Sequence, residues 1–337
     1  MKPTKFAKYL TEFLTTYLSG QKNVSKNTIL SYRDTFKLLL RYCQDLKRIP
    51  PERITMETIT SELIISFLDW LEIERKCRIS TRNQRLAAIH SFFRYAQGED
   101  PSGLYYFQKV LSIPIKKAEK TLVEHLTPEA VRLLLGQPDQ HTTKGRRDLT
   151  LISVLYDTGA RVQELIDIKV CDVTLDSPSV IVLTGKGNKI RRVPITKNTV
   201  ALLQYYFSEN NLNKPWKNQY PLFSNNQHNK LTKEGVAYII AKYVETARKS
   251  STIIPPKVKV HQLRHSKAMH LLQAGVNLIY IRDFLGHVDI KSTEVYARTD
   301  TETKRKAIEN VYPDLIDSDL PDWNKDQNLL TWLSELK

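Results

Sequence analysis

The sequence is poor in cysteine and lacks any long apolar run. Only three cysteines, Cys43, Cys77 and Cys171, occur among 337 residues, and their spacing matches neither a metal-binding motif nor a disulfide framework. No stretch approaches the roughly 18 consecutive apolar residues that a membrane-spanning helix needs. The first residues mix lysine with isolated apolar side chains and form no apolar core of the signal-peptide type. We therefore expect a soluble cytoplasmic protein with no membrane partner.

Acidic residues are scarce relative to basic ones. The chain holds 51 Lys and Arg against 36 Asp and Glu, which gives a net charge of +15 and a pI near 9.5. Lys and Arg that neutralise phosphates release condensed counterions, so this excess favours a polyanionic partner. The net charge is +7 over residues 1–115, +13 over 116–306 and −5 over 307–337. The first two segments suit DNA, whereas the acidic end suits a contact with protein.

Apolar periodicity predicts helices in the first third of the chain. Apolar side chains recur at three- and four-residue steps over 28–46 and 59–75. A third helix is expected to follow an N-cap at Ser80 or Thr81 and to bury Leu86, Ile89, Phe92 and Phe93. Its other side carries Arg82 and Arg85, which either contact a phosphate backbone or form a solvated face.

A linker separates this helical part from a mixed one. Residues 113–117 combine a proline and charge with little periodicity, and a new helix opens at Thr127-Pro128, a cap followed by proline. We place the domain boundary near residue 118. Farther on, β-branched runs at 180–184 and 190–195 flank a glycine-rich turn and predict a hairpin with Lys186 near its tip.

The remaining elements of the second part are helical. Helices are predicted over 147–158, where Gly159 ends the helix, and over 199–209, 233–249, 261–274 and 278–285. The fold class is therefore mainly α with a small antiparallel β-sheet.

Six side chains suggest chemistry on a phosphodiester without a metal: Arg161, Lys186, His261, Arg264, His287 and Tyr296. Attack by a side-chain nucleophile adds negative charge to a five-coordinate phosphorus, so it needs fixed cations and groups that move protons. The planar arginine fork binds two phosphate oxygens at once. Histidine, with a pKa of about 6.5, exchanges protons near neutrality with tyrosine, whose pKa is about 10. A tyrosine adduct also retains the bond energy for resealing.

Two motifs resemble other kinds of site, but each lacks a defining residue. His261 and His265, four residues apart, resemble half of a zinc site, yet Gln262 stands where a zincin needs its glutamate. The Gly-Lys-Gly segment at 185–187 resembles a phosphate loop but lacks the following Ser or Thr. We therefore expect neither a metal nor a nucleotide cofactor.

The ordered set of motifs resembles the tyrosine recombinases of the phage-integrase and Xer type, over residues 5–310. The matching features are Thr-Gly-Ala-Arg-Val-Gln-Glu-Leu at 158–165, the hairpin Lys186, His-x-x-Arg-His at 261–265, Leu-Gly-His at 285–287 and Thr-x-x-Tyr at 293–296. The resemblance implies a helical, SAM-like core-binding domain over 1–117 that clamps DNA, and a mixed α+β catalytic domain over 118–310. It also implies that the tail over 311–337 contacts another subunit, with packing on its own subunit as the alternative.

The resemblance implies a role for each of the six residues. Tyr296 attacks the scissile phosphate, forms a 3′-phosphotyrosine and frees a 5′-hydroxyl. Arg161 and Arg264 hold the nonbridging oxygens, and Lys186 protonates the leaving 5′ oxygen.

The histidines complete the implied pocket. His261 assists as a general acid or base, and His287 donates a hydrogen bond to the phosphate. Glu164 and His265 are assigned to support of these groups. Arg298 departs from the family pattern, since many relatives carry another histidine there.

The implied partners are double-stranded DNA recombination sites, a homotetramer assembled on paired sites, and possible accessory DNA-bending proteins. The implied purpose is integration or excision of a mobile element, or Xer-like resolution. Two alternatives remain open. A type IB topoisomerase would share the adduct but relax supercoils without a specific site, and a non-catalytic DNA-binding protein would form no adduct.

Overall fold

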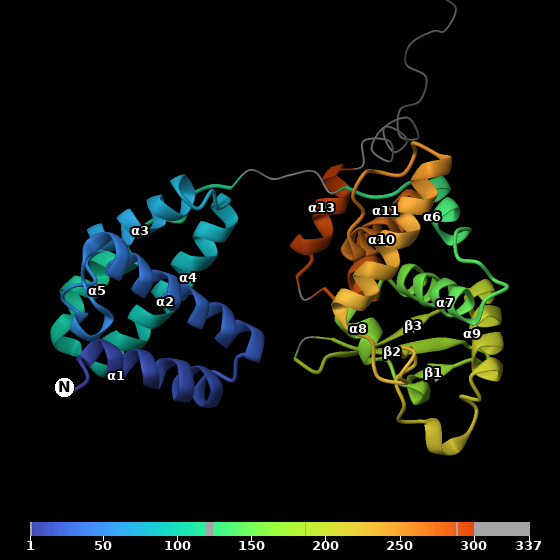
Figure 1. The fold of residues 1–337 in the computed structure, drawn as a ribbon, viewed down its shortest axis with the longest axis horizontal. Coiled ribbons are helices and arrows are strands. Elements are labelled where there is room, and N and C mark those ends of the chain that lie inside the picture. Colours follow the sequence, from blue (N-terminus) through green and yellow to red (C-terminus); the bar gives the residue numbers. More distant parts are fainter. Residues whose placement is uncertain (1, 119–123, 186, 288, 300–337) are drawn as a thin grey trace, which may run out of the picture. The chain divides into compact units, whose positions relative to one another are not determined.

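The computed structural model describes residues 2–118, 124–185, 187–287 and 289–299, which belong to two compact units divided after Thr121 (Figure 1). Unit 1 is helical, and unit 2 combines helices with a three-stranded antiparallel sheet. The predicted fold class, mainly α with a small antiparallel sheet, is confirmed. The acidic tail expected over 311–337 lies outside the described residues.

Unit 1 is built from five α-helices within the described part of the chain. They are α1 (Lys5–Glu12), which continues into a π-helical stretch (Phe13–Gln21), α2 (Lys26–Lys47), α3 (Ser61–Ile73), α4 (Ile79–Glu99) and α5 (Leu104–Leu111). The helices predicted over 28–46 and 59–75 are confirmed as α2 and α3. The hydroxyls of Ser25 and Thr60 cap these two helices by accepting a backbone N–H of the first turn.

An aromatic cluster forms the core of unit 1. Phe92 of α4 is fully buried, and its ring centroid lies 5.6 Å from that of Phe6, 5.5 Å from that of Phe13 and 5.1 Å from that of Phe36. All three pairs meet edge to face, which is a favoured geometry for aromatic rings. Residues from α1, the π-helical stretch, α2 and α4 are thereby joined at one side chain.

The start of α4 differs from the prediction. The helix begins at Ile79 with Arg78 as its N-cap, so the expected cap at Ser80 or Thr81 is wrong. Hydroxyl residues at the first turn are a common start signal, but here the extended backbone of Arg78 places the boundary earlier. The expected burial of Leu86, Ile89, Phe92 and Phe93 is confirmed.

The two arginines of α4 bond to other parts of unit 1, so the expected solvated face is wrong, and a contact with a phosphate stays a prediction. Arg82 is only 4% exposed; its Nε lies 3.2 Å from a carboxylate oxygen of Glu72, and its Nη1 donates to the carbonyl of Pro114. The Nη1 of Arg85 donates to the carbonyl of Ser31 at 3.0 Å. These side chains tie α4 to its neighbours and to the segment that leaves unit 1.

The described part of unit 2 contains α6 (Pro128–Leu135), α7 (Thr143–Thr158), α8 (Val162–Asp167), α9 (Lys197–Glu209), α10 (Lys233–Ser250), α11 (Val260–Gln273), α12 (Leu278–Leu285) and α13 (Lys291–Thr299). The sheet is formed by β1 (Val173–Thr174), β2 (Val180–Thr184) and β3 (Ile190–Pro194) in the order β1-β2-β3, with Ile181 opposite Val193. The predicted hairpin and the predicted helices of this part are confirmed. The two-residue strand β1 is too short to give a periodic signal.

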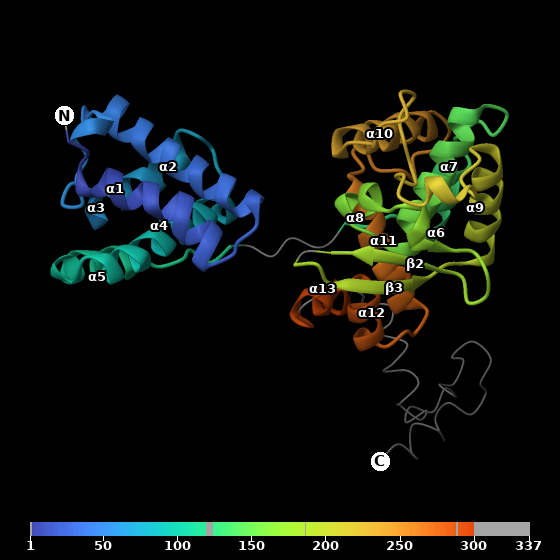
Figure 2. The same ribbon diagram turned by 90° about the horizontal axis from the view of Figure 1, so that it is seen from below.

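Helix α7 lies at the centre of unit 2 and packs against both α9 and α11. Nearly every residue from Asp148 to Thr158 is buried, and the carboxylate of Asp148 accepts hydrogen bonds from Arg147 and from the phenol of Tyr243. Helices α11, α12 and α13 pack on one another at one side of the unit (Figure 2). The end of α7 therefore meets the helices that carry the carboxyl-terminal motifs.

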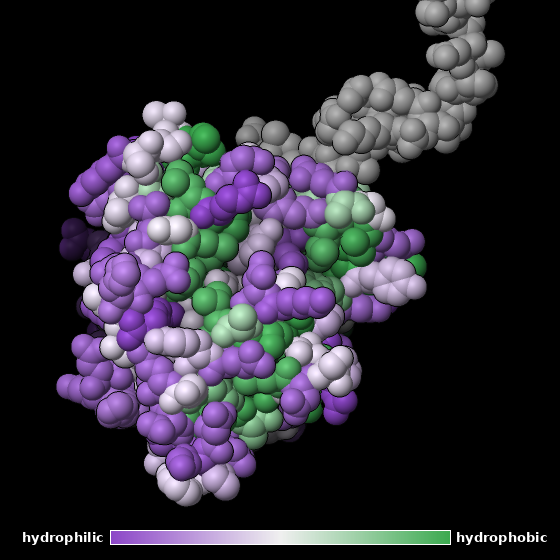
Figure 3. Space-filling view, turned by 90° about the vertical axis from the view of Figure 1, so that its right-hand side faces the viewer, coloured by the Kyte–Doolittle hydropathy of each residue, from purple (hydrophilic) through white to green (hydrophobic). Residues whose placement is uncertain are grey.

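One face of the structure shows hydrophilic side chains around hydrophobic patches (Figure 3). Among the described residues, no helix is both long and apolar enough to cross a membrane.

Replacement of Phe92 by alanine should destabilise unit 1 strongly. Removal of a buried phenylalanine leaves a cavity and costs about 3–5 kcal/mol of unfolding free energy. Thermal unfolding of the whole chain should then show an early transition that the wild type lacks. Ile73→Ala is the matched control, because Ile73 is 70% exposed, and an early transition of equal size in this variant would contradict the role of the aromatic core.

Candidate active site

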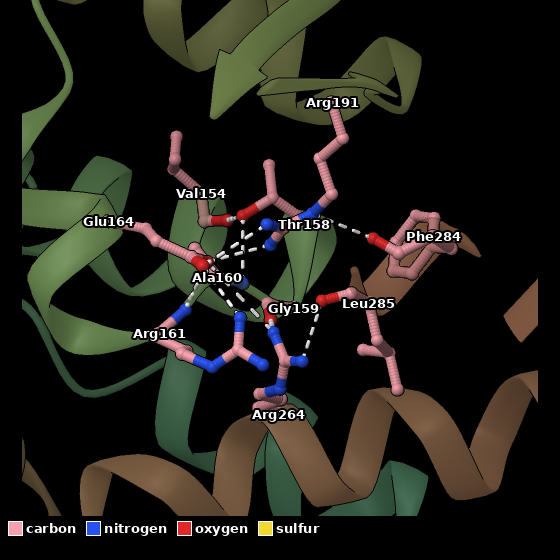
Figure 4. A network of polar contacts seen from close by, with 10 residues as sticks. All are labelled: Val154, Thr158, Gly159, Ala160, Arg161, Glu164, Arg191, Arg264, Phe284 and Leu285. Atoms are coloured by element: carbon pink, nitrogen blue, oxygen red, sulfur yellow. Dashed lines mark hydrogen bonds and ion pairs between the residues drawn. The ribbon is translucent and has the colours of Figure 1, made fainter. Parts of the chain in front are cut away.

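The candidate site is organised around one buried carboxylate. Glu164 of α8 is 3% exposed at its side chain, and its oxygens accept hydrogen bonds from the backbone N–H and the Nη1 of Arg161, at 2.9 and 2.7 Å. Arg191 of β3 donates from Nη1 and Nη2 at 3.1 and 2.7 Å, and Nη1 of Arg264 lies 4.0 Å away (Figure 4). Three elements far apart in the sequence thus place their guanidinium groups around a single anion.

Arg264 is held by the ends of two helices. It comes from α11, is 1% exposed, and donates to the carbonyl of Gly159 at 2.7 Å and to that of Leu285 at 2.6 Å. These carbonyls end α7 and α12 and have no partner within their own helices. Burial, followed by the charge of Arg161, lowers the pKa of Arg264 to about 9, so the group remains charged at neutral pH.

Arg191 is a site residue that the sequence motifs did not identify. Besides its bonds to Glu164, its Nε donates to the carbonyl of Phe284 in α12 at 3.0 Å. A usable signal exists in the strand pattern, because Arg191 and the buried Val193 lie on the same face of β3. An arginine on the buried face of a strand needs an anionic or carbonyl partner inside the protein.

Gly286 allows Arg191 to lie against the end of α12. It caps α12 with a φ of +65°, a left-handed conformation that suits glycine. A Cβ atom there would lie 3.0 Å from Nη1 and 3.1 Å from Cδ of Arg191, closer than side chains normally pack. The glycine of the Leu-Gly-His motif therefore allows both the left-handed turn and the close approach of the Arg191 side chain. The turn places His287 at the site.

Tyr296 of α13 is buried, with 2% of its surface exposed. Its hydroxyl lies 2.8 Å from Nδ1 of His265, and its ring is nearly parallel to that of His287 at a centroid distance of 6.4 Å. Burial raises the pKa of Tyr296, and the charges of Arg264 and Arg161 act against this rise. The phenol therefore stays protonated at neutral pH in the DNA-free protein.

The imidazoles of the site are neutral at neutral pH. Burial, followed by nearby positive groups, lowers the pKa of His265 and that of His287 to about 4 each. Desolvation and the charges of Arg264 and Arg161 also lower the pKa of His261. Nδ1 of His287 lies 2.9 Å from the hydroxyl of Thr293, which orients this ring.

The structure brings together five of the six residues that the sequence suggested. The charges of Arg161 and Arg264 act on His261, His287 and Tyr296, so these side chains share one electrostatic environment. A cavity of about 430 Å³ opens beside them, lined by residues that include Arg161, Gly185, Lys189, Arg191 and His287. Lys186 lies outside the described residues. Among the described residues, no group of three His, Cys, Asp or Glu side chains is arranged to hold a metal.

Comparison with known proteins identifies the class. Residues 124–303 match the phage integrase family, and residues 10–100 match the N-terminal SAM-like domain of phage integrases. The chain therefore belongs to the phage integrase family. It is a tyrosine recombinase, an enzyme of site-specific DNA recombination, and the relatives do not favour the topoisomerase or non-catalytic alternatives.

Two relatives illustrate the similarity in sequence. A protein named as an integrase/recombinase, y4rC, of Sinorhizobium fredii is 37% identical over 337 residues, which cover 99% of each chain. The tyrosine recombinase XerD of Staphylococcus haemolyticus is 32% identical over 305 residues, or 88% of this chain and 96% of that protein.

Two solved structures share the fold. The XerH recombinase bound to a palindromic difH substrate has a TM-score of 0.70 at 22% identity, over 86% of this chain and 81% of that one. The Tn1549 transposon integrase in complex with transposon right end DNA also has a TM-score of 0.70, at 18% identity, over 90% and 98% of the two chains.

Arg191→Gln should destabilise unit 2. The change removes a charged donor from a buried carboxylate and from a helix-end carbonyl, which costs about 1–3 kcal/mol of unfolding free energy. Arg192→Gln is the matched control, because Arg192 is exposed on the opposite face of β3 and should change stability by less than about 0.5 kcal/mol. Urea unfolding measures both, and equal losses would show that Arg191 has no special structural role.

Glu164→Gln should remove a pH-dependent part of the stability. Burial raises the pKa of Glu164, but hydrogen bonds from Arg191 and Arg161 outweigh it and lower the pKa from 4.5 to about 2. A carboxyl with a lowered folded pKa stabilises the protein above its unfolded pKa, and this contribution is lost as the pH falls. Below pH 4.5 the wild type should therefore lose stability more steeply than the variant, by up to about 1.4 kcal/mol per pH unit. Parallel pH profiles in urea unfolding would contradict this assignment.

Proposed function

We propose that Tyr296 is the nucleophile of this recombinase and that it joins the DNA as a 3′-phosphotyrosine while freeing a 5′-hydroxyl. The observation that supports this is the position of its phenol, which is buried within the field of Arg161 and Arg264 and hydrogen-bonded to a neutral imidazole. A tyrosine that serves only to fill the core does not require two nearby guanidinium charges. A group that must become an oxyanion and attack phosphorus does need them.

Arg161 and Arg264 hold the nonbridging oxygens of the scissile phosphate in this proposal. Arg161 bonds Glu164 through Nη1, and its side chain is still 38% exposed, so a phosphate can reach it. The two hydrogen bonds from Arg264 to backbone carbonyls use only part of its five N–H donors. Both arginines are thus fixed by protein contacts before DNA arrives, which lowers the cost of organising the site.

The remaining groups move or stabilise protons and charge. Lys186 protonates the leaving 5′ oxygen, His261 assists as a general acid or base, and His287 hydrogen-bonds the phosphate. His261 suits this role because it is exposed, while Thr293 orients the ring of His287.

The proposal extends to the whole chain. Residues 1–117 form a clamp on the duplex, residues 118–310 form the catalytic domain, and residues 311–337 contact a neighbouring subunit in a tetramer on paired DNA sites, with DNA-bending proteins as accessory partners. The basic charge of the first two segments and the acidic charge of the third support this division. Recombination then serves integration or excision of a mobile element, or Xer-like resolution, in the cytoplasm.

Tyr296→Phe should abolish covalent attachment to DNA. The test uses nicked suicide duplexes from the ends of the protein's own genetic element, since loss of a short fragment traps the adduct. The wild type should give a protein–DNA band that withstands denaturing electrophoresis, and the variant should give none.

Tyr280→Phe is the matched control, because Tyr280 is a tyrosine of the same unit that is 70% exposed. It should form the adduct as the wild type does. Adduct formation by Tyr296→Phe would refute Tyr296 as the nucleophile, provided that the variant binds the duplex normally.

A further inference from the structure

Helix α11 carries two histidines that each contact a tyrosine hydroxyl through Nδ1. His265 contacts Tyr296 at 2.8 Å, and His270 contacts Tyr156 at 2.7 Å. The second pair is structural, because Nε2 of His270 also contacts the backbone carbonyl of Leu126 at 2.9 Å. The first pair involves the oxygen that attacks phosphorus in the proposed function.

We propose that His265 is a catalytic residue, the base that accepts the phenolic proton of Tyr296 during attack on the phosphate. The proposal rests on the proposed function, since it assumes Tyr296 as the nucleophile. It gives His265 a direct part in the reaction, beyond the supporting role implied by the family resemblance. The contact between Nδ1 and the reacting oxygen is already formed without DNA.

The other two histidines of the site are less well placed for this transfer. Nδ1 of His287 lies 2.9 Å from Thr293, and its ring lies nearly parallel to the ring of Tyr296. The ring of His261 meets the ring of His265 edge to face, with 4.4 Å between the ring centroids. Among the described residues, the contact with Nδ1 of His265 is the only side-chain hydrogen bond made by the Tyr296 hydroxyl.

The surroundings of His265 keep its ring neutral. The groups whose charges act on it are His261 and Arg264 of the same helix and His125 from the segment before α6, and none of these is a carboxylate. Tyr296 of α13 faces Nδ1. A neutral ring that carries its hydrogen on Nε2 has an unshared electron pair at Nδ1, directed at the phenol.

Binding of DNA strengthens this base. A DNA phosphate carries a negative charge, and its arrival raises the proton affinity of a nearby imidazole. The same phosphate brings the phosphorus to the phenol, while Arg161 and Arg264 stabilise negative charge on the reacting oxygens. The low proton affinity of the DNA-free ring therefore rises when the transfer is required.

The step is balanced in protons and bonds. The O–H bond of Tyr296 breaks as Oη bonds to phosphorus, and its proton moves to Nδ1 of His265. The bond from phosphorus to the 5′ oxygen breaks, and that oxygen takes a proton from a separate donor, which is Lys186 in the proposed function. In the reverse step the imidazolium of His265 returns its proton to Oη as the bond between Oη and phosphorus breaks.

The test separates deprotonation of the nucleophile from protonation of the leaving group. The substrate is a suicide duplex in which sulfur replaces the bridging 5′ oxygen, because a thiolate leaves without protonation. With His265→Asn, whose amide still hydrogen-bonds the phenol but takes no proton, adduct formation at neutral pH should slow by about 10²- to 10⁴-fold. His270→Asn, which disrupts the matched pair with Tyr156, should react at close to the wild-type rate.

The pH dependence provides a second readout. Without a base, attack requires prior ionisation of Tyr296, whose pKa is raised, so the rate of His265→Asn should increase about tenfold per pH unit through the neutral range. The wild-type rate should change far less over that range, because His265 accepts the proton during attack and no prior ionisation of Tyr296 is required. A role limited to holding the tyrosine would leave the two profiles parallel.

Three outcomes would overturn the proposal. The first is adduct formation by His265→Asn at the wild-type rate. The second is a slower rate in this variant that weaker DNA binding or a lower melting temperature explains. The third is a faster reaction in His265→Phe, which would mean that His265 restrains the nucleophile. Tyr296→Phe in the same assay distinguishes a failure of the proposed function from a failure of this inference. An adduct in that variant defeats the proposed function, whereas its absence beside a fast His265→Asn defeats this inference alone.

Discussion

The bonding of Glu164 to the arginines is the interaction on which the catalytic unit depends. Guanidinium groups from the N-cap of α8, from β3 and from α11 repel one another, and a buried site weakens the screening of that repulsion. A carboxylate among them offsets one of the three charges and gives two of the arginines a fixed hydrogen-bond partner. The cluster keeps a positive surplus, which suits the extra negative charge that phosphorus acquires during attack. A neutral side chain at position 164 would leave three cations without a counterion.

Local signals explain why much of the fold could be predicted. Thr127-Pro128 and Gly159 act within one turn of their own helices, and the hairpin is set by a short turn between two β-branched runs. The arginines of α4 show where this reasoning stops. Periodicity places Arg82 and Arg85 on one side of a helix, but it does not reveal that Glu72, the carbonyl of Pro114 and that of Ser31 lie opposite them.

The site also contains residues that the sequence could predict and residues that it could not. Ordered motifs led to Arg161, Arg264 and Tyr296, because residue type and spacing carry that information in the sequence itself. Arg191 carries no motif, and its importance arises only when β3 packs beside α8 and α12. The contact of His265 with Tyr296 likewise depends on the packing of α13 against α11, which no spacing encodes.

The buried arginines are held largely by neutral backbone carbonyls, which leaves most of their positive charge uncompensated. Arg264 and Arg191 bind the carbonyls of Gly159, Leu285 and Phe284, at the ends of α7 and α12. Helix carboxyl ends carry partial negative charge, so they attract a guanidinium and fix its orientation. They do not ionise, so they hold the arginines without cancelling a full positive charge. A site built from further carboxylates would be as well ordered, but it would repel the phosphate that these arginines are placed to receive.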